Sequence, residues 1–377
     1  MHILGVAVLI NPKGSKSAPV WVVVDRPLST DKDRGYLFSG GLGYMWDKMM
    51  ADAGFSQSDY CVVCRAPDTE HPHAYTNIIG ELNHDKPPII IPLEAAGQHL
   101  CDVLDAKSKD VDSAAELEKQ AGSILQSDKL IYPAYVIPTY GPQTIAAQYK
   151  QRDIIVSCDL AKAKSELDYW RANGHVLQKL PERELRIDFT FDELIEILRS
   201  YHNFPLLSND IETIYPKRGT SAKTTSVLYK IHPGYPITVG LAPSKTSGIS
   251  FDLFRESEVE TRILWQELNR LLKKVPQLGQ NFFNFDLNFY EMLGYEINPY
   301  TCQDTLIRHH VLWPELPHKL QFLTRQYTRE PYYKDDHNGW NGKDMSKLKR
   351  YNALDCCVTM EVFEAQEQEF LERPHLR

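Results

Sequence analysis

The sequence predicts an α/β protein built from two domains. Its 377 residues exceed the ~250 to 300 residues at which a single hydrophobic core usually stops growing. Residues 1–165 alternate apolar runs with helical segments, and a second alternation begins near residue 186. The stretch 166–185 between them is polar and contains Gly174 and Pro181. We therefore expect one domain over 1–165, a linker over 166–185 and a second domain over 186–377.

Strand and helix signals occur in both halves. Apolar runs typical of strands lie at residues 20–24, 88–93 and 135–138, with a helix expected around 42–53. A further strand is expected over 185–189. Thr190-Phe-Asp-Glu193 is then a capping box, which predicts a helix over 193–199.

Composition indicates a soluble globular protein of the cytoplasm. The chain is 42% apolar, and no stretch approaches the ~18 consecutive apolar residues of a membrane helix. The first ten residues lack the basic region and cleavage site of a secretory signal. Seven scattered cysteines do not resemble a disulfide framework, so we expect reduced thiols. Cys61 and Cys64 form a single CxxC, for which we expect no metal.

The net charge is −8. A protein that holds long DNA through its phosphates normally has a basic face. Any contact with nucleic acid is therefore expected to be local, as in an enzyme that holds the end of a strand.

A first pair of acids follows an apolar strand signal, in Phe204-Pro-Leu-Leu-Ser-Asn-Asp210-Ile-Glu212. Residues two apart in a strand face the same side, so Asp210 and Glu212 would project together and Ile211 would enter the core. The same spacing in Asp68-Thr69-Glu70 shows that the pattern also arises by chance.

A third acid, Asp286, stands where a short strand runs into a helix, in Leu278-Gly-Gln-Asn-Phe-Phe-Asn-Phe-Asp286. A carboxylate in the first turn is favoured by the helix dipole. The alternative interpretation is a simple N-terminal cap.

Tyr351 and Asp355 stand four apart in a helical segment and so share a face. Tyr149 with Asp153 and Tyr332 with Asp336 have the same spacing, and the alternative for any such pair is a solvated helix face.

Taken together, these segments resemble the DEDD 3′→5′ exonucleases, in particular the proofreading domain of family A DNA polymerases with a tyrosine in the last motif. The resemblance spans residues 186–372 and includes Cys302-Gln-Asp304-Thr and the stretch 316–334. It implies an RNase H-like domain with a mixed central sheet. One departure is an additional residue between Gly279-Gln280-Asn281 and Asp286.

The resemblance implies a two-metal mechanism with Mg²⁺ or Mn²⁺, which prefer oxygen ligands. Asp210 would bridge both ions, Glu212 and Asp355 would complete the site of the attacking water, and Asp286 would serve the second ion. Tyr351, with help from Glu212, would orient the water. Without metal, clustered carboxylates would repel one another.

The same resemblance places Gln280 and Asn281 near the terminal nucleotide. Phe282 or Phe283 would offer a stacking face for a base, although a phenylalanine beside a strand is more often part of the core. The polar loop 334–344 is expected to edge the cleft that binds the strand.

The first domain resembles the uracil-DNA glycosylase superfamily, especially its iron–sulfur branch, and an α/β/α fold is implied. The segments that carry the likeness are Val22-Val-Val-Asp25, Gly35-Tyr-Leu-Phe38 with the helix after it, Cys64-Arg-Ala-Pro67 and Ile137-Pro-Thr-Tyr-Gly141-Pro142. Phe38 matches the aromatic that stacks on a base, with a packed core ring as the alternative.

The chemical positions of that superfamily are changed. Its Gly-Glu is Val24-Asp25 here, its final His-Pro is Gly141-Pro142, and its asparagine has no counterpart. Cys64 stands where one cluster ligand belongs, but the leading cysteine pair is missing. We therefore expect neither glycosylase activity nor an iron–sulfur cluster.

These observations predict a DNA 3′→5′ exonuclease that proofreads replication as a subunit or fragment of a DNA polymerase, acts on single-stranded 3′ ends and has no membrane partner. Three alternatives stay open. They are a dual enzyme in which Asp25 supports uracil excision, a non-catalytic binding module that serves a polymerase, and an RNA-trimming nuclease.

Overall fold

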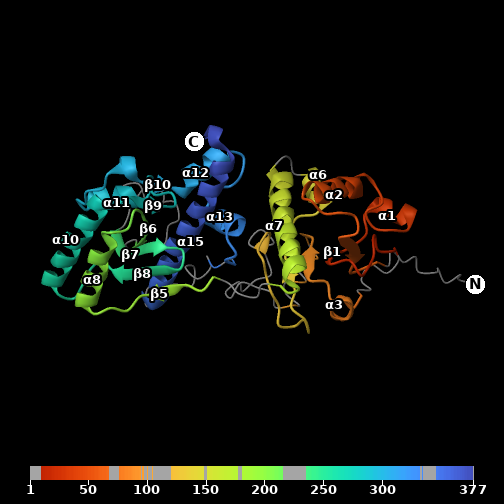
Figure 1. Cartoon of the computed structure of the whole chain (residues 1–377), viewed down its shortest axis with the longest axis horizontal. Helices are drawn as coiled ribbons and strands as arrows, with labels where there is room; N and C mark the ends of the chain where they lie inside the picture. The colour runs from red at the N-terminus through yellow and green to blue at the C-terminus, as the bar shows by residue number, and fades with distance from the viewer. Residues whose placement is uncertain are drawn as a thin grey trace, which may run out of the picture. The chain divides into compact units, whose positions relative to one another are not determined.

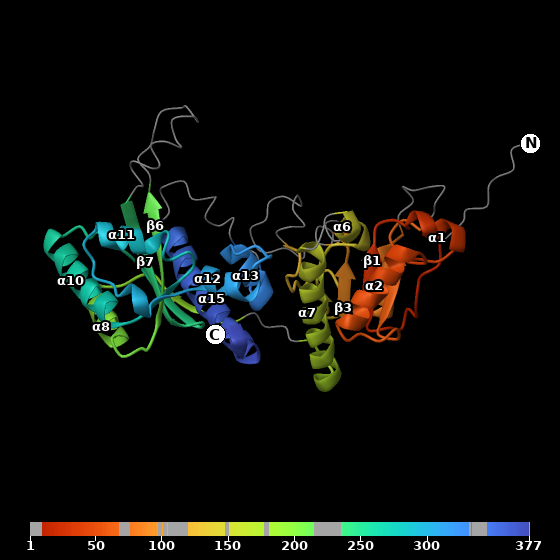
Figure 2. The same cartoon turned by 90° about the horizontal axis from the view of Figure 1, so that it is seen from above.

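A computed structural model describes residues 10–67, 76–94, 96, 100, 104, 120–147, 151–176, 181–214, 235–331, 333 and 345–376. The chain forms two compact units (Figures 1 and 2). Unit 1 comprises Met1–Leu180 with Arg329–Tyr333, and unit 2 comprises Pro181–Thr328 with Lys334–Arg377. In the described part, none of the helices combines the length and apolar character needed to cross a bilayer.

Unit 1 contains a four-stranded parallel sheet in the order β2-β1-β3-β4. Its strands are β1 (Val20–Val24), β2 (Tyr60–Cys64), β3 (Ile89–Pro92) and β4 (Tyr135–Val136). Every residue of these strands is buried, as in a parallel sheet covered on both faces. The α/β class expected for this half is confirmed. Cys61 and Cys64 lie within β2 as free thiols.

The described helices of unit 1 are α1 (Ser29–Arg34), α2 (Gly41–Asp52), α3 (Ile78–Asp85), α6 (Pro142–Ala147) and α7 (Gln151–Asn173). Helix α7 includes residues 166–173, which the sequence suggested as the start of a linker. The residues that it buries recur at helical spacing and form one stripe: Ile155, Val156, Asp159, Leu160, Ala163, Glu166 and Leu167. A long helix that buries only such a stripe is polar elsewhere, which explains the linker-like composition.

Arg329–Tyr333 groups with unit 1, and Arg329 makes a partly buried polar contact there. The Arg329 guanidinium donates to the Glu166 carboxylate and to the Tyr135 hydroxyl, the latter at 3.0 Å. It also lies 5.3 Å from the centre of the Tyr135 ring. This short segment therefore belongs to the fold of unit 1 although it follows unit 2 residues in sequence.

Unit 2 contains a six-stranded mixed sheet in the order β10-β9-β6-β7-β8-β5. Its strands are β5 (Glu184–Arg186), β6 (Leu207–Ile214), β7 (Tyr235–Ser244), β8 (Ser247–Asp252), β9 (Gln277–Gly279) and β10 (Gln303–Asp304). The neighbours β6, β7 and β8 are antiparallel, whereas β9 runs parallel to β6 and β10 parallel to β9. This mixed order is the RNase H-like arrangement expected from the sequence.

The helices of unit 2 in the described residues are α8 (Phe191–Tyr201), α10 (Glu258–Lys274), α11 (Asp286–Met292), α12 (Thr305–Leu312), α13 (Leu320–Tyr327) and α15 (Met345–Glu372), with short 3₁₀ turns η1 (Pro299–Thr301) and η2 (Pro374–Leu376). The capping box before α8 is confirmed: Glu193 N donates to Thr190 Oγ1, and Thr190 N donates to Glu193 Oε2 at 2.9 Å. Thr190 and Glu193 thus satisfy each other's backbone N–H groups.

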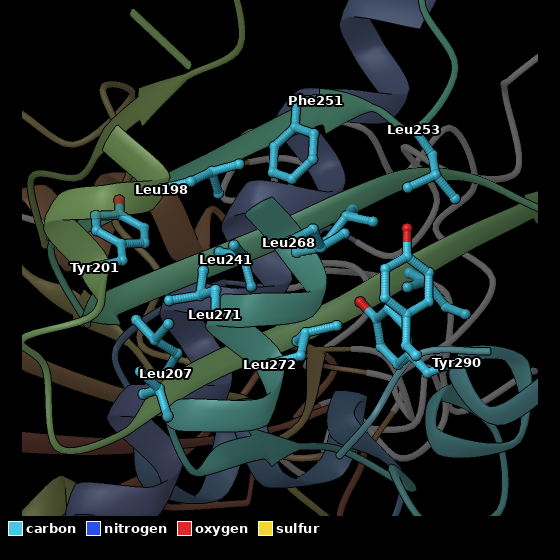
Figure 3. Close-up of a cluster of buried hydrophobic side chains, with 14 of the residues drawn as sticks. Leu198, Tyr201, Leu207, Leu241, Phe251, Leu253, Leu268, Leu271, Leu272 and Tyr290 are labelled. Atoms are coloured by element: carbon cyan, nitrogen blue, oxygen red, sulfur yellow. The ribbon is translucent and has the colours of Figure 1, made fainter. Parts of the chain in front are cut away.

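The sheet of unit 2 lies between two helical layers (Figure 1). Leucines of α8 and α10 pack against Leu241 and Phe251 on one face, as Figure 3 shows. Helix α15 contacts β6, β7 and β8 on the other face. Because side chains alternate along a strand, Ile211 enters the α8–α10 core, and its neighbours Asp210 and Glu212 belong to the face covered by α15.

Candidate active site

Asp210 and Glu212 lie in the middle of β6, beside β7. Asp210 stands opposite Gly240, and Glu212 stands opposite Thr238. The glycine matters because a Cβ there would lie 2.6 Å from Asn352 Oδ1. Gly240 therefore lets α15 approach the sheet closely beside Asp210. The alternation predicted from the sequence holds, since both acids lie on the side opposite to Ile211.

Asp286 is brought to the same strand from α11. Its Oδ1 accepts a hydrogen bond from Ile211 N at 3.0 Å, between the two acids of β6. Its exposure is 2%, and burial, together with the charges of Asp304 and Glu212, raises its pKa well above the usual range. The N-cap position of α11 is Phe285 rather than Asp286, and it makes no side-chain cap bond. Asp286 is therefore not the N-cap of α11, and its side chain contacts β6 instead.

Tyr351 and Asp355 share a face of α15, and both are buried. Burial, the charges of Asp355, Glu212 and Asp210, and a hydrogen bond with Asp355 all raise the pKa of Tyr351 far above its ordinary value. The phenol therefore keeps its proton. Tyr351 can donate a hydrogen bond at this site but is not a phenolate base.

The buried thiol of Cys356 lies close to acids from each of these segments. Its pKa is raised by burial and by the charges of Asp210, Asp355 and Asp286, which come from three different elements. Like charges collected in a poorly solvated place repel one another, and a cation relieves that repulsion. The structure thus brings the predicted carboxylates and the tyrosine to one region of unit 2.

The chemistry of these donors suits a divalent ion. All four acids offer oxygen ligands, the kind that Mg²⁺ and Mn²⁺ prefer. Within the ranges that the structure describes, no three His, Cys, Asp or Glu side chains are already gathered closely enough to hold an ion. Binding of an ion would therefore require some of these acidic side chains to move.

Gln280 and Asn281 form a tight turn after β9. Gln280 donates from Nε2 to His318 O at 2.8 Å and accepts from Thr305 Oγ1 at 2.6 Å. Asn281 has a φ of 62° and accepts bonds from the backbone N–H groups of Asn284 and Phe285. Asparagine tolerates this left-handed conformation better than most residues, so Asn281 suits the turn.

The two phenylalanines in this turn differ. Phe282 is fully buried in the core cluster of unit 2, so its ring is not available to stack on a base. The expectation for Phe282 is corrected: the turn directs its side chain inward, beneath Gly279. Phe283 is half-buried, with its ring centre 6.1 Å from that of Phe282, and remains a candidate for stacking.

Two further residues belong to the site although the sequence did not single them out as site residues. Asp304 is buried and accepts hydrogen bonds from Asn281 N and Leu306 N, both at 2.9 Å, so it holds the turn and caps α12. The family-like Cys302-Gln-Asp304-Thr was its signal. Asn352 donates to Asp210 Oδ2 at 2.7 Å, and no sequence pattern pointed to it.

In unit 1, Phe38 is 3% exposed and packs edge-on against Trp46, with 6.1 Å between ring centres. Its φ of 53° is unusual for a residue other than glycine. Asp25 is ion-paired with Arg65 at 2.6 Å. Phe38 is therefore a core ring here, and Asp25 already has a cationic partner.

Several sequence expectations fall outside the described residues. These are the loop 334–344, the triplet Asp68–Glu70, and the residues Tyr149, Tyr332 and Asp336.

No family model and no curated protein matches the chain. Among solved structures, the catalytic core of RRP6 from Trypanosoma brucei is similar at 13% identity and a TM-score of 0.40, covering 53% of this chain and 52% of that one. The Nibbler EXO domain of Aedes aegypti gives 15% and 0.39, covering 53% and 94%. Escherichia coli RNase D, an exoribonuclease, gives 12% and 0.37, covering 51% and 49%. The chain thus spans about half the length of the first and third of these.

Proposed function

We propose that residues 186–377 form a metal-dependent 3′→5′ exonuclease that removes nucleotides from the 3′ end of a DNA strand. One observation carries the proposal. Asp286 is bonded to the backbone between Asp210 and Glu212, and α15 brings Tyr351 and Asp355 to the same place. Gathering acidic side chains from β6, α11 and α15 in one place does not stabilise the fold. A function that depends on a bound cation explains this arrangement better.

The residues have separate tasks in this proposal. The carboxylates of Asp210, Glu212, Asp286 and Asp355 would hold two Mg²⁺ or Mn²⁺ ions, which supply activation of water and charge stabilisation during phosphodiester hydrolysis. Tyr351, whose hydroxyl keeps its proton, would orient the attacking water through a hydrogen bond with it. The turn at Gln280 and Asn281, with Phe283, would contact the terminal nucleotide.

Proofreading as a subunit or domain of a DNA polymerase is the proposed context, supported by the sequence resemblance of residues 186–372. Unit 1 is proposed to be a glycosylase-like domain without glycosylase activity that binds DNA or a protein partner. Its Asp25–Arg65 ion pair and its buried Phe38 support this part of the proposal.

Digestion of a 5′-labelled single strand with Mg²⁺ or Mn²⁺ tests the nuclease. The wild type should produce a ladder of shortened products, and Asp210→Ala with Glu212→Ala should slow it by at least ~10³-fold, as losses of catalytic groups do. Glu196→Ala with Glu291→Ala is a matched control, because it removes two exposed acids from the same unit. Parallel DNA and RNA strands identify the preferred sugar.

Three results would contradict the proposal. They are a strand that survives long incubation with wild type and Mn²⁺, a ladder unchanged by the double substitution, and equal losses in the matched control. Faster trimming of RNA than of DNA would keep the nuclease and overturn the assignment of DNA as its substrate.

A further inference from the structure

Asn352 follows Tyr351 in α15, and its amide side chain is fully buried. It faces β7 at Gly240, where a side chain on the strand would collide with its Oδ1 and with Cys356 Sγ, at 2.6 and 2.8 Å. Burying an amide is costly unless its polar atoms are satisfied. The position thus needs an explanation that packing alone does not supply.

Both ends of the amide are used. Nδ2 donates to Asp210 Oδ2 at 2.7 Å and to Asp210 O at 3.1 Å. Oδ1 accepts a hydrogen bond from Ser250 Oγ at 2.7 Å. Ser250 lies on β8 and is itself fully buried.

Asp210 determines which way the amide stands, because its carboxylate and carbonyl oxygens only accept hydrogen bonds and so require Nδ2 on their side. Ser250 anchors the amide in that orientation by donating to Oδ1. The flipped amide would place Oδ1 against a carboxylate oxygen, and two acceptors repel. Ser250 therefore acts on Asp210 through Asn352.

The consequence for Asp210 is a fixed carboxylate. The Asn352 amide holds Oδ2 of Asp210 and, at the same time, the backbone carbonyl oxygen of Asp210. Rotation about the final side-chain bond is thereby restricted, and Oδ1 is the oxygen that this contact leaves to other partners. Groups that hold a metal-binding carboxylate in this manner typically change metal affinity or activity by ~10- to 100-fold when removed.

We propose that Asn352 is a positioning residue for the Asp210 carboxylate and that Ser250 anchors its amide. This inference rests on the proposed function, because it assigns Asn352 a role toward the cation that Asp210 would bind. The competing interpretation is structural: Asn352 would merely tie α15 to the sheet.

The test measures Mn²⁺ binding from the electron paramagnetic resonance signal of free Mn²⁺, alongside digestion of a labelled single strand. Asn352→Ala should weaken Mn²⁺ binding by ~10- to 100-fold. Ser250→Ala, a smaller change, should weaken it by about 2- to 10-fold, the value of one hydrogen bond. The combined variant should bind Mn²⁺ no more weakly than Asn352→Ala alone does, because the serine acts through the amide.

Gln366→Ala is the matched control. Gln366 is another fully buried amide of α15, and it donates to Thr305 O at 3.0 Å. Its loss should lower resistance to urea without changing Mn²⁺ binding. If Asn352→Ala does not fold, Ser250→Ala still tests the inference through the same readout.

Unchanged Mn²⁺ binding in Asn352→Ala or, if that variant does not fold, in Ser250→Ala would overturn the inference. Additive losses in the combined variant, or an equal loss in Gln366→Ala, would do so as well. Asp210→Ala separates this result from the larger proposal. If Asp210→Ala changes neither binding nor digestion, the proposed function fails; if it abolishes both while the amide variants change neither, only the role of Asn352 fails.

Discussion

Two buried acids of unit 2, Asp286 and Asp304, accept hydrogen bonds from backbone N–H groups. Asp286 accepts from Ile211 N, and Asp304 accepts from Asn281 N and Leu306 N. Burial nevertheless raises the pKa of both carboxyl groups. Asp304 is occupied by the turn that it holds, whereas Asp286 lies beside the acids of β6. Their surroundings, rather than their residue type, separate a structural acid from a candidate ligand.

A histidine cluster provides a residue-scale prediction that is independent of the carboxylates. His309 is fully buried, and its Nδ1 lies 2.7 Å from His318 Nδ1, while His310 Nδ1 lies 3.1 Å from His318 Nε2. Burial, and then the charges of His318 and His310, lower the pKa of His309 to about 3. Folding therefore keeps this imidazole neutral.

The sign of the resulting pH dependence follows. Between the unfolded pKa of 6.5 and the folded value of about 3, the unfolded chain binds a proton that the folded chain does not. The stability contribution is present above pH 6.5 and is lost as the pH falls. Between pH 7.5 and 5 we expect His309 to account for a loss of about 2 kcal/mol.

Urea unfolding of wild type and His309→Gln at both pH values measures this difference. The wild type should lose more stability on acidification than the variant does. Equal losses would show that His309 is not responsible, because carboxylates titrate alike in both proteins.

At the scale of elements, α15 and the sheet depend on glycines at their contact. A Cβ at Gly248 would lie 2.7 Å from Cys357 Sγ and 2.8 Å from Ala353 O. The second of these is a backbone atom that cannot move independently of the helix. The close approach of α15, which brings Tyr351 and Asp355 to β6, therefore requires small residues on β7 and β8.

Gly248→Ala should destabilise unit 2 by about 1 to 3 kcal/mol, the usual cost of overpacking. Gly41→Ala, at the start of α2, is the matched substitution, because no atom lies within 4 Å of its added Cβ. Thermal unfolding should show a lower midpoint for the unit carrying Gly248→Ala and no loss for Gly41→Ala. An unchanged midpoint for Gly248→Ala would mean that the helix and sheet separate more easily than the structure indicates.

At the scale of the whole molecule, the two units have separate cores. The core of unit 2 includes Leu241 and Leu268, and the core of unit 1 includes Trp21 and Val136. Separate cores let each unit keep its own fold while its site changes.

We expect no uracil excision from unit 1. The carboxylate of Asp25 is paired with Arg65, and Gly141, where the glycosylase resemblance would call for a histidine, donates its N–H to Glu94 at 3.1 Å. Incubation of a uracil-containing single strand, followed by alkaline cleavage at abasic sites, is the measurement. Abasic sites made by wild type and abolished by Asp25→Asn would establish the dual enzyme instead.

Local patterns predicted a large part of this protein. Alternation along β6 put Asp210 and Glu212 on one side, and the four-residue spacing put Tyr351 and Asp355 on one helix face. The capping box predicted the start of α8. Each of these relations depends on backbone geometry over a few residues, so the sequence carries it directly.

Other features were missed for an equally physical reason. The linker expected over 166–185 begins inside α7, because a helix with one buried stripe is polar in composition. Phe282 lies in the core although its position beside the site suggested a stacking face. Short-range patterns do not say on which side of a turn a side chain will pack.

By itself, the sequence determined the α/β class, the mixed sheet of the second half and the acids that share a face. Only the tertiary structure decided three contacts. Asp286 reaches the backbone of β6, Asp304 holds the turn at Asn281, and Asn352 hydrogen-bonds Asp210. These contacts join segments 23 to 142 residues apart. Their existence depends on strand register and on how closely a helix packs, which are set by the fold as a whole and not by neighbouring residues.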